Sequence, residues 1–309
     1  MRIVFMGVPE FAVPVLMRLA DSEHEVIAVY TRLDKPSGRG RGISESPIKH
    51  IAEEMGLEVR QVENFKNADD VVDLASFKPD TIVVASFGII LPQSVLDIPL
   101  YGCLNLHPSL LPLYRGPTPI PATILAGDNV TGTSVMLINK DVDSGLILAQ
   151  RKVPIDLSDT TKSLTEKLAH ISADLLMEIL PGWLSRSITP RPQRHEDATY
   201  TQMLNKDDGE LDWGLSATEL WRKVRAYYPW PVGSTSWHGK GMRILETLPQ
   251  SGQLDEPGRV LDLGHGEIGV QTGSGILKLV RVQVEGKKEM VIAEFVRGQR
   301  SFVGSKLPS

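Results

Sequence analysis

The sequence predicts an α/β fold, in which a doubly wound and mostly parallel sheet is followed by a small OB-like β-barrel. In the first half, apolar runs without alternation recur between segments of helical periodicity. Such runs are typical of parallel strands that are buried on both faces. Near the C-terminus, short alternating runs are separated by glycine-rich turns, which is typical of antiparallel barrels.

The elements of the first half follow from the positions of these runs. Apolar runs predict strands at 2–6, 26–30, 81–85, 103–106 and 134–138, and helical periodicity predicts helices at 9–20, 47–55 and 162–180. We expect the last helix to end at Pro181-Gly182. In a sheet of this kind, ligands bind at the carboxyl ends of the strands.

The length of 309 residues predicts two domains. Residues 1–183 are expected to form the α/β domain. Residues 184–204 are polar, proline-containing and rich in arginine, so we interpret them as an interdomain linker. Residues 205–309 are expected to form the second domain, with one helix near 216–226 and the barrel after it.

Composition restricts the class of protein. Apolar residues make up 41% of the chain, yet no apolar run approaches the roughly 20 residues of a membrane span. The single cysteine, Cys103, excludes an internal disulfide framework and a Cys-rich metal site, and its apolar surroundings indicate a packed core thiol. We therefore expect a cytoplasmic protein. The net charge of −5 argues against indiscriminate binding of nucleic acid, although residues 205–309 carry +1 and the remainder −6.

Two glycine patterns bear on cofactor use. Residues 264–269 match G-x-G-x-x-G, but β-like residues follow, so hairpin turns are the better interpretation. The first strand ends in Gly7-Val8-Pro9-Glu10, with one glycine and a proline where a dinucleotide loop needs more glycine. Both observations disfavour a dehydrogenase that binds a nicotinamide cofactor.

Asn105 and His107 are the main candidate for chemistry. At i and i+2 of a strand, their side chains leave the same face, near a carboxyl end. An amide and an imidazole can together stabilise an oxyanion and move a proton. The alternative is a turn asparagine and a histidine whose bonds are satisfied by backbone.

A carboxylate could complete this pair. Asp143 precedes Ser144-Gly145 at a tight turn after the strand at 134–138, whereas Asp141 is better interpreted as a solvated charge. No G-x-S-x-G elbow and no Cys–His pair is present, so the three residues fit direct attack of an external nucleophile on a carbonyl.

Basic residues gather in three places. The loop at 31–50 has a balance of +3 and includes Lys35, Arg39 and Arg41. Its length and its glycines favour contact with a phosphate backbone, although a short charged run is usually a solvated loop. Arg222, Lys223 and Arg225 on the predicted C-terminal helix, and Lys287-Lys288 at a hairpin tip, are weaker candidates for the same role.

The motifs taken together resemble those of the 10-formyltetrahydrofolate-dependent formyltransferase family, with the greatest likeness to the members that act on methionyl-tRNA. The resemblance rests on NLHPSLLPLYRG, DVDSGLIL, SGRGRG, ASFGIILP, YPWP and GKKEM, and it covers nearly the whole chain. One departure is Ile43-Ser44-Glu45 after the Arg-Gly loop, where further lysines are common in the family.

The resemblance implies a function and a set of sites. A formyl group would pass from 10-formyltetrahydrofolate to the α-amino group of initiator methionyl-tRNA, without a metal and on a monomeric protein. The catalytic residues would be Asn105, His107 and Asp143; the folate would contact Ser109, Leu110, Leu111, Pro112, Phe87, Ile89 and Leu91; and the tRNA would contact Lys35, Arg39, Arg41, Arg222, Lys223, Lys287 and Lys288. Formylation of an amino-sugar nucleotide and a non-catalytic RNA-binding module are the alternatives.

Overall fold

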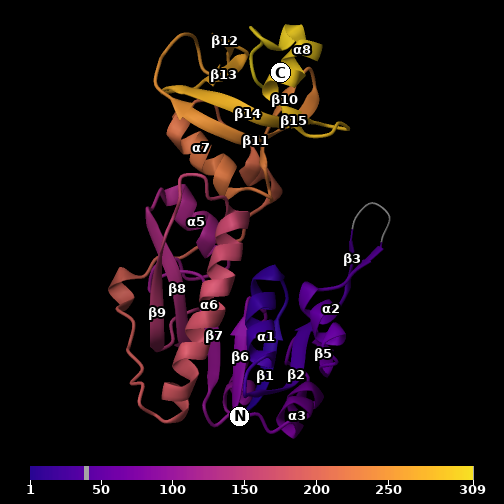
Figure 1. The fold of residues 1–309 in the computed structure, drawn as a ribbon, viewed down its shortest axis with the longest axis vertical. Helices are drawn as coiled ribbons and strands as arrows, with labels where there is room; N and C mark the ends of the chain where they lie inside the picture. Colours follow the sequence, from indigo (N-terminus) through magenta and orange to yellow (C-terminus); the bar gives the residue numbers. More distant parts are fainter. Residues whose placement is uncertain (38–41, 309) are drawn as a thin grey trace. The chain divides into compact units, whose positions relative to one another are not determined.

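The computed structural model describes residues 1–37 and 42–308, with 35–37 and 42–44 described by their backbone alone. The chain divides into two compact units (Figure 1). The first unit consists of Met1–Pro119, Val130–Ile155 and Thr165–Gln202, and the second of Ile120–Asn129, Asp156–Leu164 and Met203–Ser309.

A seven-stranded sheet forms the centre of the first unit, in the order β5-β2-β1-β6-β7-β8-β9. Neighbours from β5 to β7 are parallel, and β8 is antiparallel to both β7 and β9. The predicted fold class is therefore confirmed for this sheet. The strands are β1 (Arg2–Gly7), β2 (Glu25–Arg32), β5 (Val59–Val62), β6 (Thr81–Ala85), β7 (Cys103–His107), β8 (Val130–Leu137) and β9 (Ile147–Pro154).

Helices cover both faces of this sheet because successive residues of its strands point to opposite sides. Val4 and Met6 of β1 pack in a cluster with Leu74 and Val95, which lie on α3 (Ala68–Ser76) and α4 (Gln93–Leu96). The opposite face is covered by α1 (Val13–Ala20) and α2 (Pro47–Glu54), which pack on β2 and on one another. The chain adds strands on one side of β1 up to β5 and on the other side of β1 from β6 onward. Because crossovers between parallel strands are right-handed, this reversal places the connecting helices on opposite faces of the sheet.

Several elements differ from the expectation. The strands β5 and β9 and the helices α3, α4 and α5 (Pro119–Ala126) were not predicted, and helix α6 (Thr161–Leu184) continues past Pro181. Proline can adopt the helical φ, although it lacks the N–H group for one backbone hydrogen bond. Nε1 of Trp183 donates to the carbonyl oxygen of Tyr101 at 3.0 Å. This anchor holds the last turn of α6 on the unit.

Short elements complete the first unit. The loop at 31–50 contains the paired strands β3 (Lys35–Ser37) and β4 (Gly42–Ser44). The described residues also form short 3-10 helices, which are η1 (Glu10–Ala12) and η2 (His195–Asp197) in the first unit and η3 (Lys206–Gly209) and η4 (Arg300–Phe302) in the second.

The second unit is built on an antiparallel sheet in the order β10-β11-β14-β13-β12, with β15 paired to β14. Helix α7 packs on β11 and β14. The expected antiparallel architecture is thus confirmed, and its description as OB-like is an interpretation of this sheet. The elements are α7 (Ala217–Ala226), β10 (Gly233–Trp237), β11 (Lys240–Gln250), β12 (Val260–Gly264), β13 (Glu267–Gln271), β14 (Ile276–Val284), β15 (Met290–Val291) and α8 (Ile292–Gly298).

The literal G-x-G-x-x-G match lies at the turn between β12 and β13. His265 and Gly266 have φ values of 54° and 79°, and the two strands pair as an antiparallel hairpin. Positive φ at both central residues is the geometry of a tight hairpin turn, in which glycine is favoured. The interpretation of this match as a hairpin is therefore confirmed.

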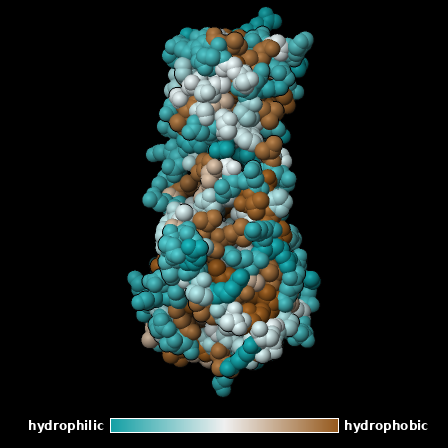
Figure 2. All heavy atoms as spheres, turned by 90° about the vertical axis from the view of Figure 1, so that its left-hand side faces the viewer, coloured by the Kyte–Doolittle hydropathy of each residue, from teal (hydrophilic) through white to brown (hydrophobic). Residues whose placement is uncertain are grey.

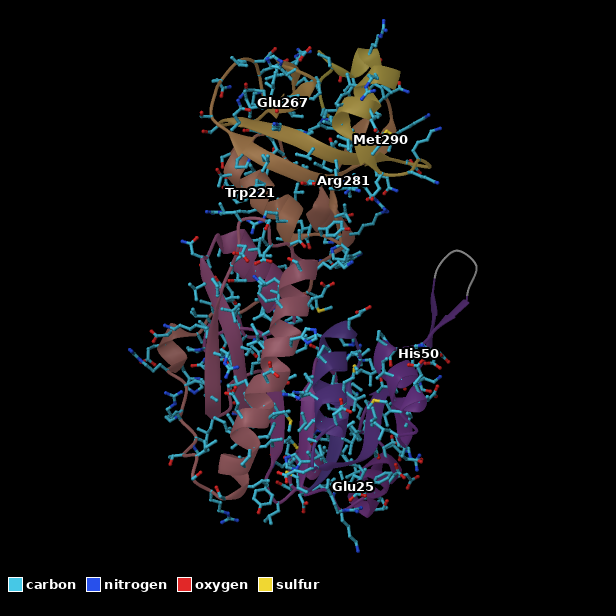
Figure 3. All side chains as sticks on the ribbon, in the orientation of Figure 1. Glu25, His50, Trp221, Glu267, Arg281 and Met290 are labelled. Carbon is cyan, nitrogen blue, oxygen red and sulfur yellow. The ribbon has the colours of Figure 1, made fainter. Side chains whose placement is uncertain are left out.

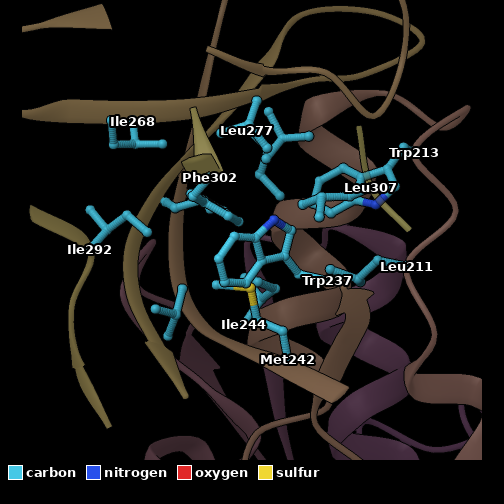
Figure 4. Close-up of a cluster of buried hydrophobic side chains, with 14 of the residues drawn as sticks. Leu211, Trp213, Trp237, Met242, Ile244, Ile268, Leu277, Ile292, Phe302 and Leu307 are labelled. Atoms are coloured by element: carbon cyan, nitrogen blue, oxygen red, sulfur yellow. The ribbon is translucent and has the colours of Figure 1, made fainter. Parts of the chain in front are cut away.

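Aliphatic and aromatic side chains together fill the core of the second unit (Figure 4). Trp237 meets Phe295 and Phe302 edge-on, at ring centroid distances of 5.6 and 5.4 Å. Leu277 and Leu307 lie in the same cluster. Edge-to-face pairs of this kind add to the stabilisation from buried area.

Two properties predicted from composition can be compared with the structure. Cys103 is buried, and burial raises the pKa of its thiol to about 12, which confirms a packed core thiol. Among the residues described, none of the helices is long and apolar enough to span a bilayer. On the face drawn in Figure 2, apolar residues reach the surface in patches between polar ones, as is usual for folded chains.

Candidate active site

Asn105, His107 and Asp143 meet on one face of β7. Nδ2 of Asn105 donates to Oδ1 of Asp143 at 3.3 Å, and Nδ1 of His107 lies 3.5 Å from Oδ2 of the same carboxylate. The His107 and Asp143 side chains are 5% and 16% exposed. The structure therefore brings together the three residues that the sequence singled out.

Both ring nitrogens of His107 face acceptors. Nε2 lies 2.9 Å from the carbonyl oxygen of Tyr114, which can only accept, so Nε2 carries a proton. Nδ1 faces the Asp143 carboxylate. A neutral His107 ring can donate to one of these two acceptors, whereas a protonated ring can donate to both. The backbone partner expected for a purely structural histidine is therefore present, and a carboxylate is present as well.

The Asp143 loop reaches His107 by folding back along β7. Because β8 is antiparallel to β7, it ends beside the start of β7, where the amide of Ile138 donates to the carbonyl of Cys103 at 2.8 Å. Asp143 has a φ of 46°, in the left-handed region that non-glycine residues seldom adopt. The amide of Gly116 donates to Oδ2 of Asp143 at 2.8 Å. Backbone geometry and a backbone donor thus aim this carboxylate.

Two side chains near Asp143 were not predicted. Arg115 is 1% exposed and Gln193 is 6% exposed. The oxygen of Gln193 accepts from Arg115, and its nitrogen donates to the carbonyls of Asp143 and Gly145. Arg115 stood in the quoted YRG motif, but Gln193 fell in a segment without periodicity, so no sequence signal identified it.

The segment expected to be a linker belongs in part to the first unit. Backbone bridges join Arg191 to Ile147 and Tyr200 to Arg115. The hydroxyl of Thr199 also accepts from the amide of Tyr114 at 2.8 Å. Part of the segment 191–201 therefore packs against the loop at 114–116, in which the carbonyl of Tyr114 contacts His107.

The turn expected to contact folate is held internally. The hydroxyl of Ser109 donates to the carbonyl of Leu113 at 2.6 Å, and the backbone of Leu111 bonds Ser134 and Gln150. Leu111 is buried, whereas Leu110 and Pro112 are half-buried. The polar groups of Ser109 and Leu111 thus fix the turn, and Leu110 and Pro112 remain partly open to a ligand.

The second expected folate segment follows β6. Phe87 and Leu91 are buried in the core cluster, and Ile89 is partly buried against it. Ile90, between them, is 79% exposed. A guanidinium nitrogen of Arg32 bonds the carbonyl of Gly88 and holds this loop against the end of β2. Phe87 and Leu91 therefore support the loop from beneath.

The basic loop at 31–50 is described only at its foot. Arg39 and Arg41, and the side chain of Lys35, lie outside the described residues. Nζ of Lys49 lies 2.7 Å from Asp34 and 2.9 Å from Glu45. The two carboxylates outweigh the positive charge of Lys49. The foot therefore contributes little to the positive charge of the loop.

The basic residues of α7 contact carbonyls of the second unit. Arg222 donates to Ala126 at 3.4 Å, Lys223 to Glu210 at 3.0 Å, and Arg225 to Asp159 at 2.8 Å. Arg225 also lies over the Trp221 ring, 4.3 Å from its centroid, and burial lowers the pKa of its guanidinium. Figure 3 labels Trp221 on this helix. Arg225 therefore has mainly a packing role.

Lys287 and Lys288 are exposed in the turn between β14 and β15. Figure 3 labels Arg281 and Met290, which flank this hairpin. The expected hairpin tip is thus confirmed, and both amines are accessible to a ligand.

The sequence is similar to known proteins over nearly its whole length. Residues 1–180 match the family described as formyl transferase, and residues 203–300 match its C-terminal domain. Methionyl-tRNA formyltransferases from Dehalococcoides mccartyi and Roseiflexus castenholzii are each 44% identical, over 99% of this chain and 98% and 99% of theirs. The chain belongs to the methionyl-tRNA formyltransferase family.

Solved structures agree with the formyltransferase fold of this family. HypX from Aquifex aeolicus has a TM-score of 0.67 at 19% identity, over 98% of this chain and 48% of that one. The sugar 3N-formyl transferase WlaRD has a TM-score of 0.66 at 17% identity, over 93% of this chain and 99% of that one. At these identities the likeness establishes the fold alone.

Proposed function

We propose that the protein transfers a formyl group from 10-formyltetrahydrofolate to the α-amino group of initiator methionyl-tRNA. The observation that carries the chemistry is that one carboxylate, Asp143, contacts both Asn105 and His107. The choice of acceptor is supported by 44% identity to methionyl-tRNA formyltransferases over 99% of the chain.

The reaction is an aminolysis of the formyl group. The neutral amine attacks the formyl carbon, a C–N bond forms and the carbonyl oxygen becomes an oxyanion. The Asn105 amide has two N–H groups, and the one that does not serve Asp143 is the proposed donor to this oxygen. Collapse breaks the bond from the formyl carbon to N10 of the folate.

Proton transfer belongs to His107 and Asp143. The attacking nitrogen loses one proton and N10 gains one, so the reaction is balanced without a further reactant. Asp143 accepts the proton of the attacking nitrogen, directly or through water. The carboxylate can pass this proton to the unprotonated Nδ1 of His107, 3.5 Å away, and Nδ1 then releases it toward N10.

The substrates are assigned to separate parts of the chain. Leu110, Pro112 and Ile89 would contact the folate. The residues that hold these three in place are Ser109, Leu111, Phe87 and Leu91. The loop with Lys35, Arg39 and Arg41 would bind the tRNA backbone, together with Lys287 and Lys288; Arg222 and Lys223 would have to exchange their carbonyl partners to take part. Residues 1–183 would act as the catalytic domain and 205–309 as the tRNA-binding domain. A monomer suffices, because one chain supplies all three catalytic residues.

One assay tests the proposal. The protein is incubated with 10-formyltetrahydrofolate and either initiator methionyl-tRNA or an amino-sugar nucleotide, and formyl transfer is followed for each. We expect transfer to the tRNA alone. Transfer to the sugar nucleotide, without dependence on RNA, would replace this proposal by the alternative of sugar formylation.

The loop is tested with Arg39→Ala. Loss of a phosphate contact is expected to raise the KM for tRNA and to reduce its dependence on salt. Lys66→Ala, at an exposed lysine outside the loop, is the matched control. Unchanged formylation by Arg39→Ala across salt concentrations would exclude a role for Arg39.

A further inference from the structure

A chain of hydrogen bonds runs from a buried cation to the backbone of Asp143. Nε and Nη2 of Arg115 donate to Oε1 of Gln193 at 3.1 and 2.7 Å. Nε2 of Gln193 donates to the carbonyl oxygens of Asp143 and Gly145 at 2.9 and 2.8 Å. Two residues 78 positions apart thus join the loop at 114–116 to the Asp143 turn.

The donor and acceptor groups fix the direction of these hydrogen bonds. A guanidinium can only donate and a carbonyl can only accept, so the Gln193 amide has one possible orientation. Bonds from a charged donor are stronger than those between neutral groups, and burial strengthens them further. The amide of Gln193 is therefore held with its two N–H groups aimed at the turn.

Arg115 is itself fixed from other sides. Its Nη1 donates to the hydroxyl of Tyr200 at 3.0 Å, its Nη2 lies 3.3 Å from Nδ1 of His195, and its guanidinium lies 5.7 Å from the Tyr200 ring centroid. These partners are neutral, since His195 must accept with an unprotonated nitrogen. The segment that carries Gln193 and Tyr200 thus surrounds a buried cation.

Asp143 depends on such support. A non-glycine residue at a φ of 46° is strained and persists only where its surroundings hold it. The loop at 114–116 also holds the side chains of the site directly, through the amide of Gly116 on Oδ2 of Asp143 and the carbonyl of Tyr114 on His107. Arg115 and Gln193 therefore connect the backbone of Asp143 to the loop that orients its carboxylate.

We propose that Arg115 and Gln193 are positioning residues for the reaction, which act by holding Asp143 against Asn105 and His107. This inference rests on the proposed function and extends it to Arg115 and Gln193. Displacement of a reacting group by about 1 Å can cost about 100-fold in rate.

Gln193→Glu is the sharpest test. A glutamate keeps the size and the acceptor oxygens for Arg115, but it removes the N–H donors and sets oxygens against the carbonyls of Asp143 and Gly145. We expect kcat to fall about 10- to 100-fold, with the KM values of both substrates nearly unchanged. Arg115→Lys, which keeps the charge but loses the two-donor fork, tests the same link from the other end. The control Arg194→Ala, at an exposed neighbour, is expected to leave kcat unchanged.

A double-mutant cycle distinguishes positioning from a general structural role. If Gln193 acts through Asp143, then Gln193→Glu should have little further effect on single-turnover rates in an Asp143→Asn background. A fall equal to that seen in the wild-type background would overturn the proposal.

A measurement without turnover separates this proposal from the proposed function. The 15N resonances of the His107 ring, assigned with His107→Gln, report its contact with Asp143. In Gln193→Glu and in Arg115→Lys they are expected to shift toward their positions in Asp143→Asn. Unchanged resonances in both variants would overturn the positioning role. Absence of formyl transfer by the wild-type protein would instead overturn the proposed function.

Discussion

The chemistry of His107 depends on the atoms that face its two nitrogens. One is a carbonyl oxygen at 2.9 Å and the other a carboxylate oxygen at 3.5 Å. Nδ1 therefore faces a negative charge, whereas Nε2 is bonded to backbone. This asymmetry assigns the mobile proton to the side of the ring that faces Asp143.

Two aspartates of one loop allow this assignment to be tested. Asp143→Asn removes the charge and one acceptor oxygen, so kcat is expected to fall by about 100- to 1,000-fold while tRNA affinity stays unchanged. The control Asp141→Asn alters an exposed side chain two residues away and should leave kcat unchanged. The measurements are steady-state formylation and filter binding of the tRNA. Equal rates for the two variants would remove Asp143 from the reaction.

At the scale of elements, the direction of β8 decides where the site forms. A parallel strand after β7 would have placed the following loop at the carboxyl edge of the sheet. The antiparallel β8 instead places this loop beside the start of β7, and it folds back over Asn105. The expectation of a site at a strand end is thus met by His107, the last residue of β7, while Asn105 lies within the strand.

Two buried threonines of the second unit differ in the hydrogen bonding of their hydroxyl groups. Among the residues described, Oγ1 of Thr247 on β11 has no hydrogen-bond partner, whereas Oγ1 of Thr272 donates to Gly275 at 2.7 Å. Thr247→Val should therefore raise the free energy of unfolding by about 1 kcal/mol, and Thr272→Val should lower it by about 1–3 kcal/mol. Urea denaturation followed by tryptophan fluorescence measures both. A loss of stability in Thr247→Val would indicate a partner for its hydroxyl.

The foot of the basic loop is expected to depend on pH. The bond from Lys49 holds the pKa of Asp34 below its ordinary value of 3.8. This contribution to stability is present above pH 3.8 and is lost as the pH falls through the lower folded pKa. The difference in Tm between wild type and Lys49→Met should therefore be present at pH 7 and shrink in acid.

Lys66→Met is the control for this comparison, because Lys66 is exposed. Its Tm is expected to match that of the wild type at both pH values. A difference between wild type and Lys49→Met that stays constant down to pH 2 would show that Lys49 stabilises the loop by packing rather than by charge.

At the scale of the whole molecule, the units are not continuous in sequence. Residues 120–129 and 156–164 belong to the second unit. The hydroxyl of Thr161 donates to the carbonyl of Ala226 at 2.6 Å. The second unit is therefore completed by two segments that precede residue 184 in the chain.

Truncation after residue 204 tests this organisation. The fragment 1–204 retains both early segments but lacks the rest of their unit, so contacts such as the bond from Thr161 to Ala226 would be lost. We expect a lower Tm than that of the full chain and an increase in the fluorescence of the apolar dye ANS. A fragment with the Tm of the full chain and no ANS signal would show that residues 1–204 fold independently.

The sequence by itself predicted the fold class and the three polar residues that meet in the candidate site. Strands buried on both faces must be apolar throughout, and two residues at i and i+2 must share a face, so local pattern was sufficient for these. The short and partly exposed β5 lacked such a pattern and was missed.

Only the tertiary structure decided what orients those residues. Gln193 is distant from Asp143 in sequence and lies in an aperiodic segment, and its role depends on a buried arginine that it meets in space. Hydrogen bonds between side chains and distant backbone impose no spacing on the chain, so no local pattern records them. The candidate catalytic residues were therefore visible in the sequence, whereas their alignment is set by contacts that form only on folding.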